Sequence, residues 1–170
     1  MVVLLLFMTQ SLTAWSFNLA PEKVPFTAPD VRFSSQGGEH SLTEYKGRKV
    51  MLWLFSTWCH TCVASVKAMQ KKQATWEKTG LEILVLRNYK NGGYPGVDMP
   101  AFIQRFAPQV KQTNAWTIGE ASQQMDQKLN AKKFPDIYFL IDEKGWVQAV
   151  NTAPNITMDV ILKFAREAPQ

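Results

Sequence analysis

The hydrophobic residues of this chain gather in short runs that glycine, proline and polar residues separate. The run at 51–55 is continuous, which favours a strand buried on both faces of a sheet, and 81–86 is typical of a second buried strand. Between them, a helical period of three and four runs from Cys62 to Trp76, with Gln73 as the only polar member of its face. A strand, a helix and a strand in this order predict a parallel pair joined by a right-handed crossover.

The remaining segments predict further strands and helices around this unit. Gln36, Gly37 and Gly38 lie between the stretches 31–33 and 39–42 and indicate a β-hairpin. The later expected elements are a loop at 88–97, a helix from Asp98 to Ala107, a short strand at 115–117 within the ambiguous segment 110–118, a helix at 120–131, a hairpin of strands 137–141 and 146–150, and a helix from Thr157. Ile156 and Ile161 are spaced for a hydrophobic staple around the start of that last helix.

Composition adds that the chain can bury a sizeable core. With 170 residues, 46% apolar and 12% aromatic, it suits one domain. The net charge is +5, but the lysines are scattered and no nucleic-acid recognition motif accompanies them. We therefore expect a solvated basic surface that favours acidic partners, and no nucleic-acid binding.

The first residues form a separate uncharged segment. Residues 1–16 carry no charge, and Val2 to Met8 are all apolar, which is too short a run to span a bilayer but within the range of a signal-peptide core. Cleavage after Ser16 is plausible because small residues stand at the two positions that a signal peptidase reads. No basic residue precedes the run, so an uncleaved anchor or a buried N-terminal strand stays open. We expect residues 17–170 to form the folded domain.

Two cysteines stand where the strand at 51–55 gives way to the helix. Cys59 and Cys62 are the only cysteines of the chain, and residues three apart on a helix lie roughly 5–6 Å apart, within reach of a disulfide. The N-terminal end of a helix stabilises an anion, which lowers the pKa of the first thiol. The pattern predicts a redox pair with Cys59 as the exposed nucleophile and Cys62 as the resolving thiol.

Other uses of the pair are less favoured by the sequence. A structural zinc site needs about four ligands, and beyond the cysteines the chain offers only His40 and His60. A static disulfide closing so small a loop would remove little entropy from the unfolded chain. His60 either stabilises the Cys59 thiolate as an imidazolium or faces solvent as a neutral ring, and both alternatives stay open.

Three segments carry a resemblance to a known family. The stretch 57–62 after an apolar strand resembles the active site of the thioredoxin superfamily, and the flanks at 28–50 and 133–145 are similar to the TlpA-like (ResA-like) exported thiol-disulfide oxidoreductases. The resemblance covers about residues 28–168. It implies an α/β thioredoxin-like fold over residues 17–170, with a central mixed β-sheet flanked by helices, an N-terminal β-hairpin and an inserted βα unit at 115–131.

The resemblance also assigns roles to residues around the cysteines. Phe134 and Pro135 correspond to the family's cis-proline dipeptide, whose backbone would pair with a substrate strand by β-augmentation. Trp58 is expected to cover the sulfurs as an apolar lid. His60 and Thr61 complete the motif between the cysteines as active-site support.

The chain departs from its relatives at the acidic positions. Thioredoxin carries a buried acid six residues before the first cysteine, where this chain has Trp53, and ResA-like proteins place a glutamate three residues after the second, where it has Ser65. Asp136, directly after Pro135, is the remaining candidate to accept the Cys62 proton.

The function implied is disulfide exchange with protein substrates through Cys59 and Cys62, as a reductase in the bacterial periplasm, soluble or N-terminally anchored. The resemblance implies a monomer that is kept reduced by a membrane electron donor, with no cofactor or metal beyond the cysteine pair. Alternatives are a disulfide oxidase or isomerase, a thiol peroxidase with Ser56 three residues before Cys59, and a non-enzymatic copper chaperone. Copper-handling relatives use a CxxxC spacing and a downstream histidine, and no histidine follows His60.

Overall fold

The two central apolar runs lie side by side in the middle of a sheet in the computed structural model, which describes residues 24–110 and 115–168. They form the parallel strands β4 (Val50–Phe55) and β5 (Glu82–Arg87), as expected from the crossover between them. The sheet is mixed and has eight strands in the order β1-β8-β7-β4-β5-β6-β2-β3. Its other strands are β1 (Phe26–Thr27), β2 (Arg32–Ser35), β3 (Gly38–Ser41), β6 (Trp116–Ala121), β7 (Asp136–Ile141) and β8 (Trp146–Asn151).

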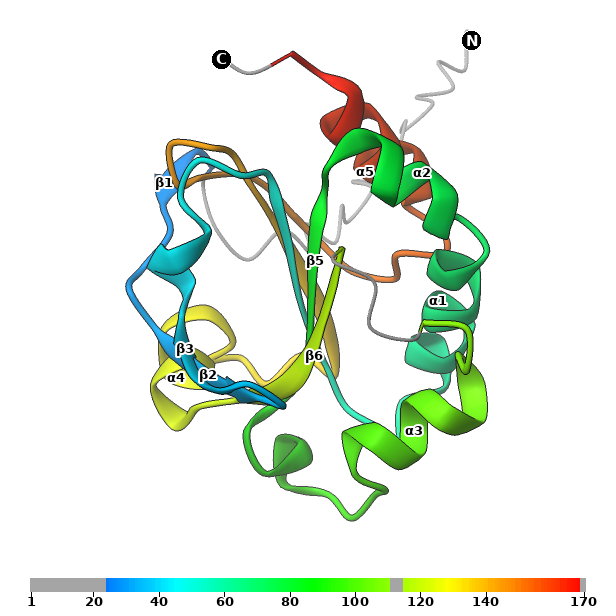
Figure 1. Ribbon diagram of the computed structural model, residues 1–170. Helices are drawn as coiled ribbons and strands as arrows, with labels where there is room; N and C mark the ends of the chain where they lie inside the picture. Colours follow the sequence, from blue (N-terminus) through cyan, green and yellow to red (C-terminus); the bar gives the residue numbers. More distant parts are fainter. Residues whose placement is uncertain (1–23, 111–114, 169–170) are drawn as a thin grey trace, which may run out of the picture.

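The side chains of β4 enter two separate cores, which explains why that run is apolar throughout. Met51, Trp53 and Phe55 belong to one core, and the alternate residues Val50, Leu52 and Leu54 belong to the other. The first core lies between the sheet and α1 (His60–Gln70), α2 (Gln73–Thr79), α3 (Met99–Phe106) and α5 (Met158–Arg166), and the second is covered by α4 (Gln123–Leu129) and the 3₁₀ turn η1 (Leu42–Tyr45) (Figure 1).

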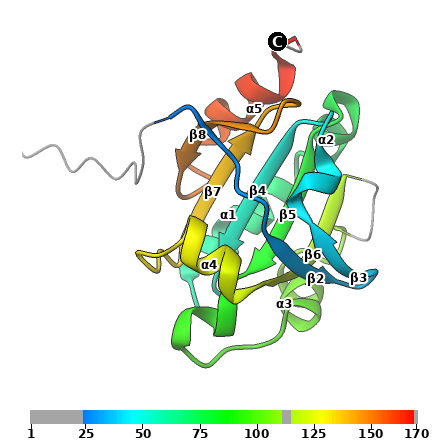
Figure 2. The ribbon, with the colours of Figure 1, turned by 90° about the vertical axis from the view of Figure 1, so that its left-hand side faces the viewer.

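The expected N-terminal β-hairpin and the expected inserted βα unit are both confirmed. The hairpin of β2 and β3 pairs through β2 with β6, so it extends the sheet beyond the parallel strands. Figure 2 looks onto the face that carries α4, which follows β6 and precedes β7 in the chain. The β6–α4 unit therefore stands between β5 and β7 in sequence, as the expected insertion does.

One long helix after the cysteines was expected, and this expectation is wrong. The chain breaks at Lys71 and Lys72, and the apolar period continues on α2. The indole N–H of Trp76 donates to the Met69 carbonyl at 2.9 Å, and the Lys72 amide donates to the same oxygen at 3.0 Å. These bonds satisfy the end of α1, and Trp76 still reaches the core because α2 turns back onto it.

The helix expected at 120–131 is shorter than predicted, because its first residues belong to β6. Pairing with β2 holds Gly119 to Ala121 in the sheet. The helix α4 then begins after Ser122, whose hydroxyl accepts a hydrogen bond from the Met125 amide at 3.1 Å. The strand predicted at 115–117 is correspondingly longer.

The hydrophobic staple expected before the last helix does not form. Ile156 is 74% exposed, whereas Ile161 is buried in the core. The hydroxyl of Thr157 donates back to the Thr152 carbonyl at 3.1 Å and caps no amide of α5. Ile156 therefore faces solvent and does not contact Ile161 across the start of the helix. The other expected elements are confirmed to within a few residues.

Two expectations fall wholly or partly outside the described residues. The leader at 1–16 lies there, as does part of the ambiguous segment at 111–114. Within the ranges that the structure describes, no helix has the length and apolar character needed to cross a membrane.

Candidate active site

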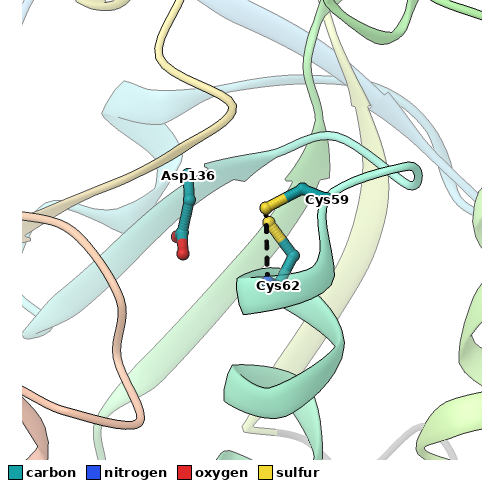
Figure 3. Close-up of side chains that lie close together, drawn as sticks. All are labelled: Cys59, Cys62 and Asp136. Carbon is teal, nitrogen blue, oxygen red and sulfur yellow. Dashed lines mark hydrogen bonds between the residues drawn. The ribbon is translucent and has the colours of Figure 1, made fainter.

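The cysteine pair lies where β4 ends and α1 begins. Cys59 is the N-cap of α1, and its sulfur accepts a hydrogen bond from the Cys62 amide at 3.3 Å (Figure 3). Both cysteines are free thiols. Cys62 is fully buried and Cys59 is 5% exposed, so the predicted nucleophile Cys59 is more covered than the sequence suggested, although it remains the accessible member of the pair.

The surroundings of Cys59 favour its thiolate. Its pKa is lowered from 9.0 to about 6, chiefly because the Cys62 side chain donates a hydrogen bond to its sulfur. The Thr61 hydroxyl and the Cys62 amide also lower the pKa, whereas burial and the negative charge of Asp136 oppose them. Cys59 is therefore largely ionised at neutral pH, as a nucleophilic cysteine must be.

Cys62 is held in the opposite protonation state. Burial raises its pKa well above the ordinary value, and its bond to Cys59 and the charge of Asp136 act in the same direction. Its sulfur also lies 3.4 Å from the carbonyl of Pro135, a second acceptor that competes with the Cys59 sulfur for the single thiol proton. The two cysteines thus have the asymmetry expected of an attacking and a resolving thiol.

Asp136 is brought to the pair by β7, the antiparallel neighbour of β4. It lies opposite Phe55, the last residue of β4, and a carboxylate oxygen lies within 4.8 Å of both sulfurs. In Figure 3 the Asp136 side chain lies beside the two sulfurs. It accepts hydrogen bonds from Trp53 Nε1 at 2.8 Å and from Thr61 Oγ1 at 3.2 Å. Burial nevertheless raises the pKa of Asp136.

Trp53 therefore supports an acid instead of replacing one. Thioredoxin has a buried acid at the position of Trp53. In this chain the Trp53 indole instead donates a hydrogen bond to the Asp136 carboxylate, which the neighbouring strand β7 supplies. Sequence reasoning could not find this bond, because it depends on the pairing of β4 with β7. Ser65 is turned elsewhere, since its hydroxyl donates to Asn155 at 2.7 Å.

Thr61 lies between Cys59 and Asp136. Its hydroxyl oxygen lies 3.0 Å from the Cys59 sulfur and 3.2 Å from an Asp136 oxygen. A hydroxyl has one proton to donate, so it cannot donate to the thiolate and the carboxylate at once. The bond that Thr61 makes is thus coupled to the charge states of both groups.

The peptide bond between Phe134 and Pro135 is trans, which corrects the expected cis-proline. Among the described residues the one cis peptide precedes Pro25. The chain turns into β7 at Lys133, which has a left-handed φ of 58°, and the Asn130 side chain brackets Phe134. The turn at Lys133 and the hydrogen bonds from Asn130 hold the backbone that leads into Pro135.

The backbone of Phe134 already has hydrogen-bond partners. Its amide donates to Asn130 Oδ1 at 2.8 Å, and its carbonyl accepts from Asn130 Nδ2 at 2.8 Å and from Asn88 Nδ2 at 3.2 Å. The Pro135 carbonyl accepts from the Ser56 amide at 2.9 Å as well as from Cys62. Sequence analysis missed both asparagines, which have no local signal apart from their position in loops.

Trp58 packs on the loop that follows β5. Its Nε1 donates to the Asn91 carbonyl at 3.0 Å, and its ring meets that of Tyr94 edge to face with centroids 5.0 Å apart. The indole is 39% exposed, and its covering of the sulfurs stays a prediction. His60, the first residue of α1, points its side chain to solvent.

The donors that could hold a metal are the two sulfurs and the Asp136 carboxylate, which lie within 4.8 Å of one another. In the described part of the chain no histidine joins this group. Three donors, one of them a hard carboxylate, are fewer than a structural zinc site needs and do not match the preference of Cu(I) for soft ligands.

The thiol asymmetry predicts the pH dependence of alkylation. In the reduced protein, Cys59 should react with iodoacetamide at a rate that rises with a midpoint near pH 6 and levels off above it, because its pKa is about 6. Cys62 should stay unlabelled in the folded protein. Quenched labelling followed by peptide mass spectrometry measures both, and equal labelling of Cys62 would contradict the assignment.

Known proteins agree with this site and fold. The Redoxin family profile matches residues 23–162. The thiol-disulfide oxidoreductase ResA of Geobacillus thermodenitrificans is 31% identical over 166 residues, which cover 94% of this chain and 88% of that protein.

Solved structures share the thioredoxin-like fold. A thioredoxin-family thiol:disulfide interchange protein of Chlorobium tepidum has a TM-score of 0.62 and 21% identity, over 85% of this chain and 98% of that one. A thiol:disulfide interchange protein of a Bacteroides species has a TM-score of 0.66 and 15% identity, over 86% and 92%. The chain therefore belongs to the Redoxin family and is a thiol-disulfide oxidoreductase with Cys59 and Cys62 as its CxxC pair.

Proposed function

We propose that this enzyme reduces disulfides of protein substrates in an extracytoplasmic compartment, with Cys59 as the nucleophile. The observation that carries the proposal is the contrast between the two thiols. Cys59 has a pKa of about 6 at the start of α1, while Cys62 is fully buried and protonated. A pair built in this way attacks with one sulfur and resolves with the other.

The exchange has two steps. The Cys59 thiolate attacks one sulfur of the substrate disulfide, which forms a mixed disulfide and releases the other substrate sulfur as a thiolate. Cys62 then loses its proton and attacks the Cys59 sulfur, which closes the Cys59–Cys62 bond and expels the second substrate thiolate. The substrate gains two electrons and the enzyme loses two. A dithiol donor must then reduce the enzyme, and we assign this role to a membrane-bound partner.

Asp136 is proposed as the base that takes the Cys62 proton in the second step. Thr61 is proposed to make the state of Asp136 depend on whether Cys59 has already reacted. The carboxylate lies within 4.8 Å of Cys62, and its raised pKa brings it closer to that of a useful base at neutral pH. When Cys59 enters the mixed disulfide its charge is lost, and the Thr61 hydroxyl is free to turn fully to Asp136. His60 is proposed to support the Cys59 thiolate electrostatically.

Phe134 and Pro135 are proposed to contact the substrate through their side chains, which are partly exposed beside Cys62. For the compartment, we propose export to the bacterial periplasm through residues 1–16, as a monomer without a further cofactor. The uncharged apolar leader and the likeness to ResA support this assignment.

The reduction potential of the pair tests the direction of the reaction. A low Cys59 pKa stabilises the reduced form, which makes the potential less negative than that of a pair without this stabilisation. We expect a value between about −270 mV, as in thioredoxin, and about −180 mV, as in protein disulfide isomerase. Equilibration with glutathione buffers measures it, and a value near about −120 mV would mark a disulfide oxidase instead.

The alternative activities are separated by direct assays. A thiol peroxidase would consume hydrogen peroxide with a thiol donor, whereas the proposed reductase would not do so at a useful rate. A copper chaperone would bind Cu(I) stoichiometrically in the reduced state, which titration with a competing chelator would show.

A further inference from the structure

We infer that Ser65 and Asn155 are positioning residues, which clamp the loop of residues 152–157 over Asp136 and keep water away from the base that serves Cys62. The loop joins β8 to α5, and in Figure 1 it is the orange segment beside α1. The inference rests on the proposed role of Asp136 as a base, and it adds the residues that make the carboxylate effective in that role.

The clamp joins the second turn of α1 to the loop through two hydrogen bonds. The Ser65 hydroxyl donates to Asn155 Oδ1 at 2.7 Å and accepts from the Asn155 amide at 3.3 Å. Ser65 is fully buried, on the helix face that also carries Cys62, whereas Asn155 is exposed. Ser65 follows Cys62 by three residues, so the clamp holds the loop to the turn of α1 next to the resolving thiol.

A second set of bonds closes the loop and joins it to β7. The Tyr138 hydroxyl donates to Thr157 Oγ1 at 2.8 Å, and the Thr157 hydroxyl donates to the Thr152 carbonyl at 3.1 Å. Tyr138 is two residues beyond Asp136 in the strand, so both side chains lie on the same face of the sheet. The loop is thus held from α1 and from β7, on the face where Asp136 meets the cysteines.

Ala153 brings the backbone of the loop onto the carboxylate. Its N–H bonds Asp136 and lowers the pKa of that group. Ala153 has a left-handed φ of 49°, which is unfavourable for a residue with a Cβ and needs the surrounding bonds to hold it. The next residue, Pro154, is buried, and Asp136 itself is 5% exposed. The loop therefore packs into the molecule where it meets the carboxylate.

The charges around Asp136 do not depend on the loop. Ionisable side chains reach Asp136 or its neighbours from α1, β7 and α5, namely Cys59, Cys62, Tyr138 and Asp159. His60, at the start of α1, points to solvent. The loop carries no charged residue, and β4 faces Asp136 with a neutral indole. Opening the loop would therefore change the hydration of the carboxylate and not the charges that face it.

The clamp should act mainly by excluding water. Burial is the largest influence on the Asp136 pKa and raises it, while the Ala153 N–H acts in the opposite direction. If the clamp were lost, water would replace the Ala153 N–H as a donor, whereas the effect of burial would be relieved. The Asp136 pKa would then fall, and the carboxylate would be a weaker base for Cys62.

The test removes the clamp from either side, with Ser65→Ala and with Asn155→Ala. A peptide disulfide whose second thiol carries a quenched fluorophore is mixed with the reduced enzyme, and stopped flow follows the release step over a range of pH. In both variants the pH at which release is half-maximal should fall by roughly half a unit, because the loop is one of several groups that cover Asp136. The maximal rate should fall by about threefold or less, as expected for a slightly weaker base.

Matched controls separate the clamp from general effects on the loop. The double variant should shift no further than Ser65→Ala alone, because both substitutions remove the same interaction. Ile156→Ala removes an exposed side chain from the same loop and should leave the pH midpoint unchanged. Carbon-13 NMR of the Asp136 carboxyl, in the reduced wild type and in Ser65→Ala, should show the same downward shift of its pKa without any substrate.

Each contrary result has a distinct meaning. Midpoints that stay at the wild-type pH, or that move upward, would overturn water exclusion by the clamp while the role of Asp136 stands. A lower maximal rate with an unchanged midpoint would do the same, since the clamp would then only hold the site in shape. Wild-type release that does not slow in acid, or that keeps its pH dependence in Asp136→Asn, would overturn the proposed role of Asp136 and the inference with it.

Discussion

Cys59→Ser should abolish disulfide exchange, with a loss on the order of a thousandfold or more, because no second nucleophile can take its place. Cys62 is fully buried, and its pKa is raised by that burial, so its sulfur is both inaccessible and protonated. The rate of reduction of a peptide disulfide by the prereduced variant measures this loss.

Cys62→Ser should instead stop the reaction halfway. Cys59 would still attack, and the mixed disulfide would accumulate because no thiol remains to resolve it. When the reduced variant is mixed with the peptide disulfide, mass spectrometry without added reducing agent should show a covalent adduct of enzyme and peptide. The two variants are matched controls for each other, since each removes one sulfur at the same turn of α1. Adducts that form equally well through Cys62 in the Cys59→Ser variant would reverse the assigned roles.

The site chemistry that could be predicted from sequence is the part carried by local pattern. The apolar run that ends at Cys59, and the three-residue spacing to Cys62, were enough to place a thiol at a helix start. Strand β4 was predicted for the same reason, because a segment buried on both faces has no polar positions. Both inferences need only neighbours in sequence.

The features that could not be predicted depend on contacts between distant segments. The length of β6 is set by β2, whose Ser34 carbonyl approaches so closely that a Cβ at Gly119 would lie 2.0 Å from it. The break after α1 depends on the indole of Trp76, and a helical period alone does not show where a side chain folds back to bond a carbonyl. In both cases tertiary contacts override a regular local pattern.

The surroundings of the cysteines show the same limit. Asp136 was proposed from a resemblance, but its contact with Trp53 follows from the antiparallel pairing of β4 and β7. Asn88 and Asn130 come from two loops that only the fold brings together around Phe134. A motif thus predicts which atoms react, whereas the groups that tune and restrict them are supplied by the rest of the fold.

Asp136→Asn should slow the release of the second substrate thiolate by roughly a hundredfold, the lower range of what a positioned base contributes. The side chain keeps its shape, and the new amide oxygen can still accept from Trp53, but the NH2 group cannot accept from Thr61. The change therefore removes the basic group and leaves the Thr61 hydroxyl to donate to Cys59. The release rate in the wild type should fall as pH falls through the raised Asp136 pKa, because the protonated acid cannot accept the Cys62 proton. The variant should lose this dependence and speed up only as pH rises toward ionisation of Cys62.

The same substitution should act on Cys59 in the opposite sense, which separates a base from a merely structural residue. The charge of Asp136 raises the Cys59 pKa, so its removal should move the alkylation midpoint below about 6. Folding should not suffer at neutral pH. Because burial raises the Asp136 pKa, the folded state binds a proton more tightly than the unfolded state, and the charged form lowers stability as pH rises. Thermal unfolding of the variant at neutral pH should therefore occur at the same temperature or higher.

A second buried acid on the same segment provides the control. Asp142 follows the far end of β7 and accepts bonds from the amides of Lys144 and Trp146, away from the cysteines. Asp142→Asn should leave both the alkylation midpoint and the release rate unchanged, whatever it does to stability. If Asp136→Asn slowed alkylation and release together, the carboxylate would be holding the site in shape. If it slowed neither, Cys62 would pass its proton to a different acceptor. Slow release combined with a lower alkylation midpoint is expected when Asp136 acts on Cys62 as a base and on Cys59 through its charge and its hold on the Thr61 hydroxyl.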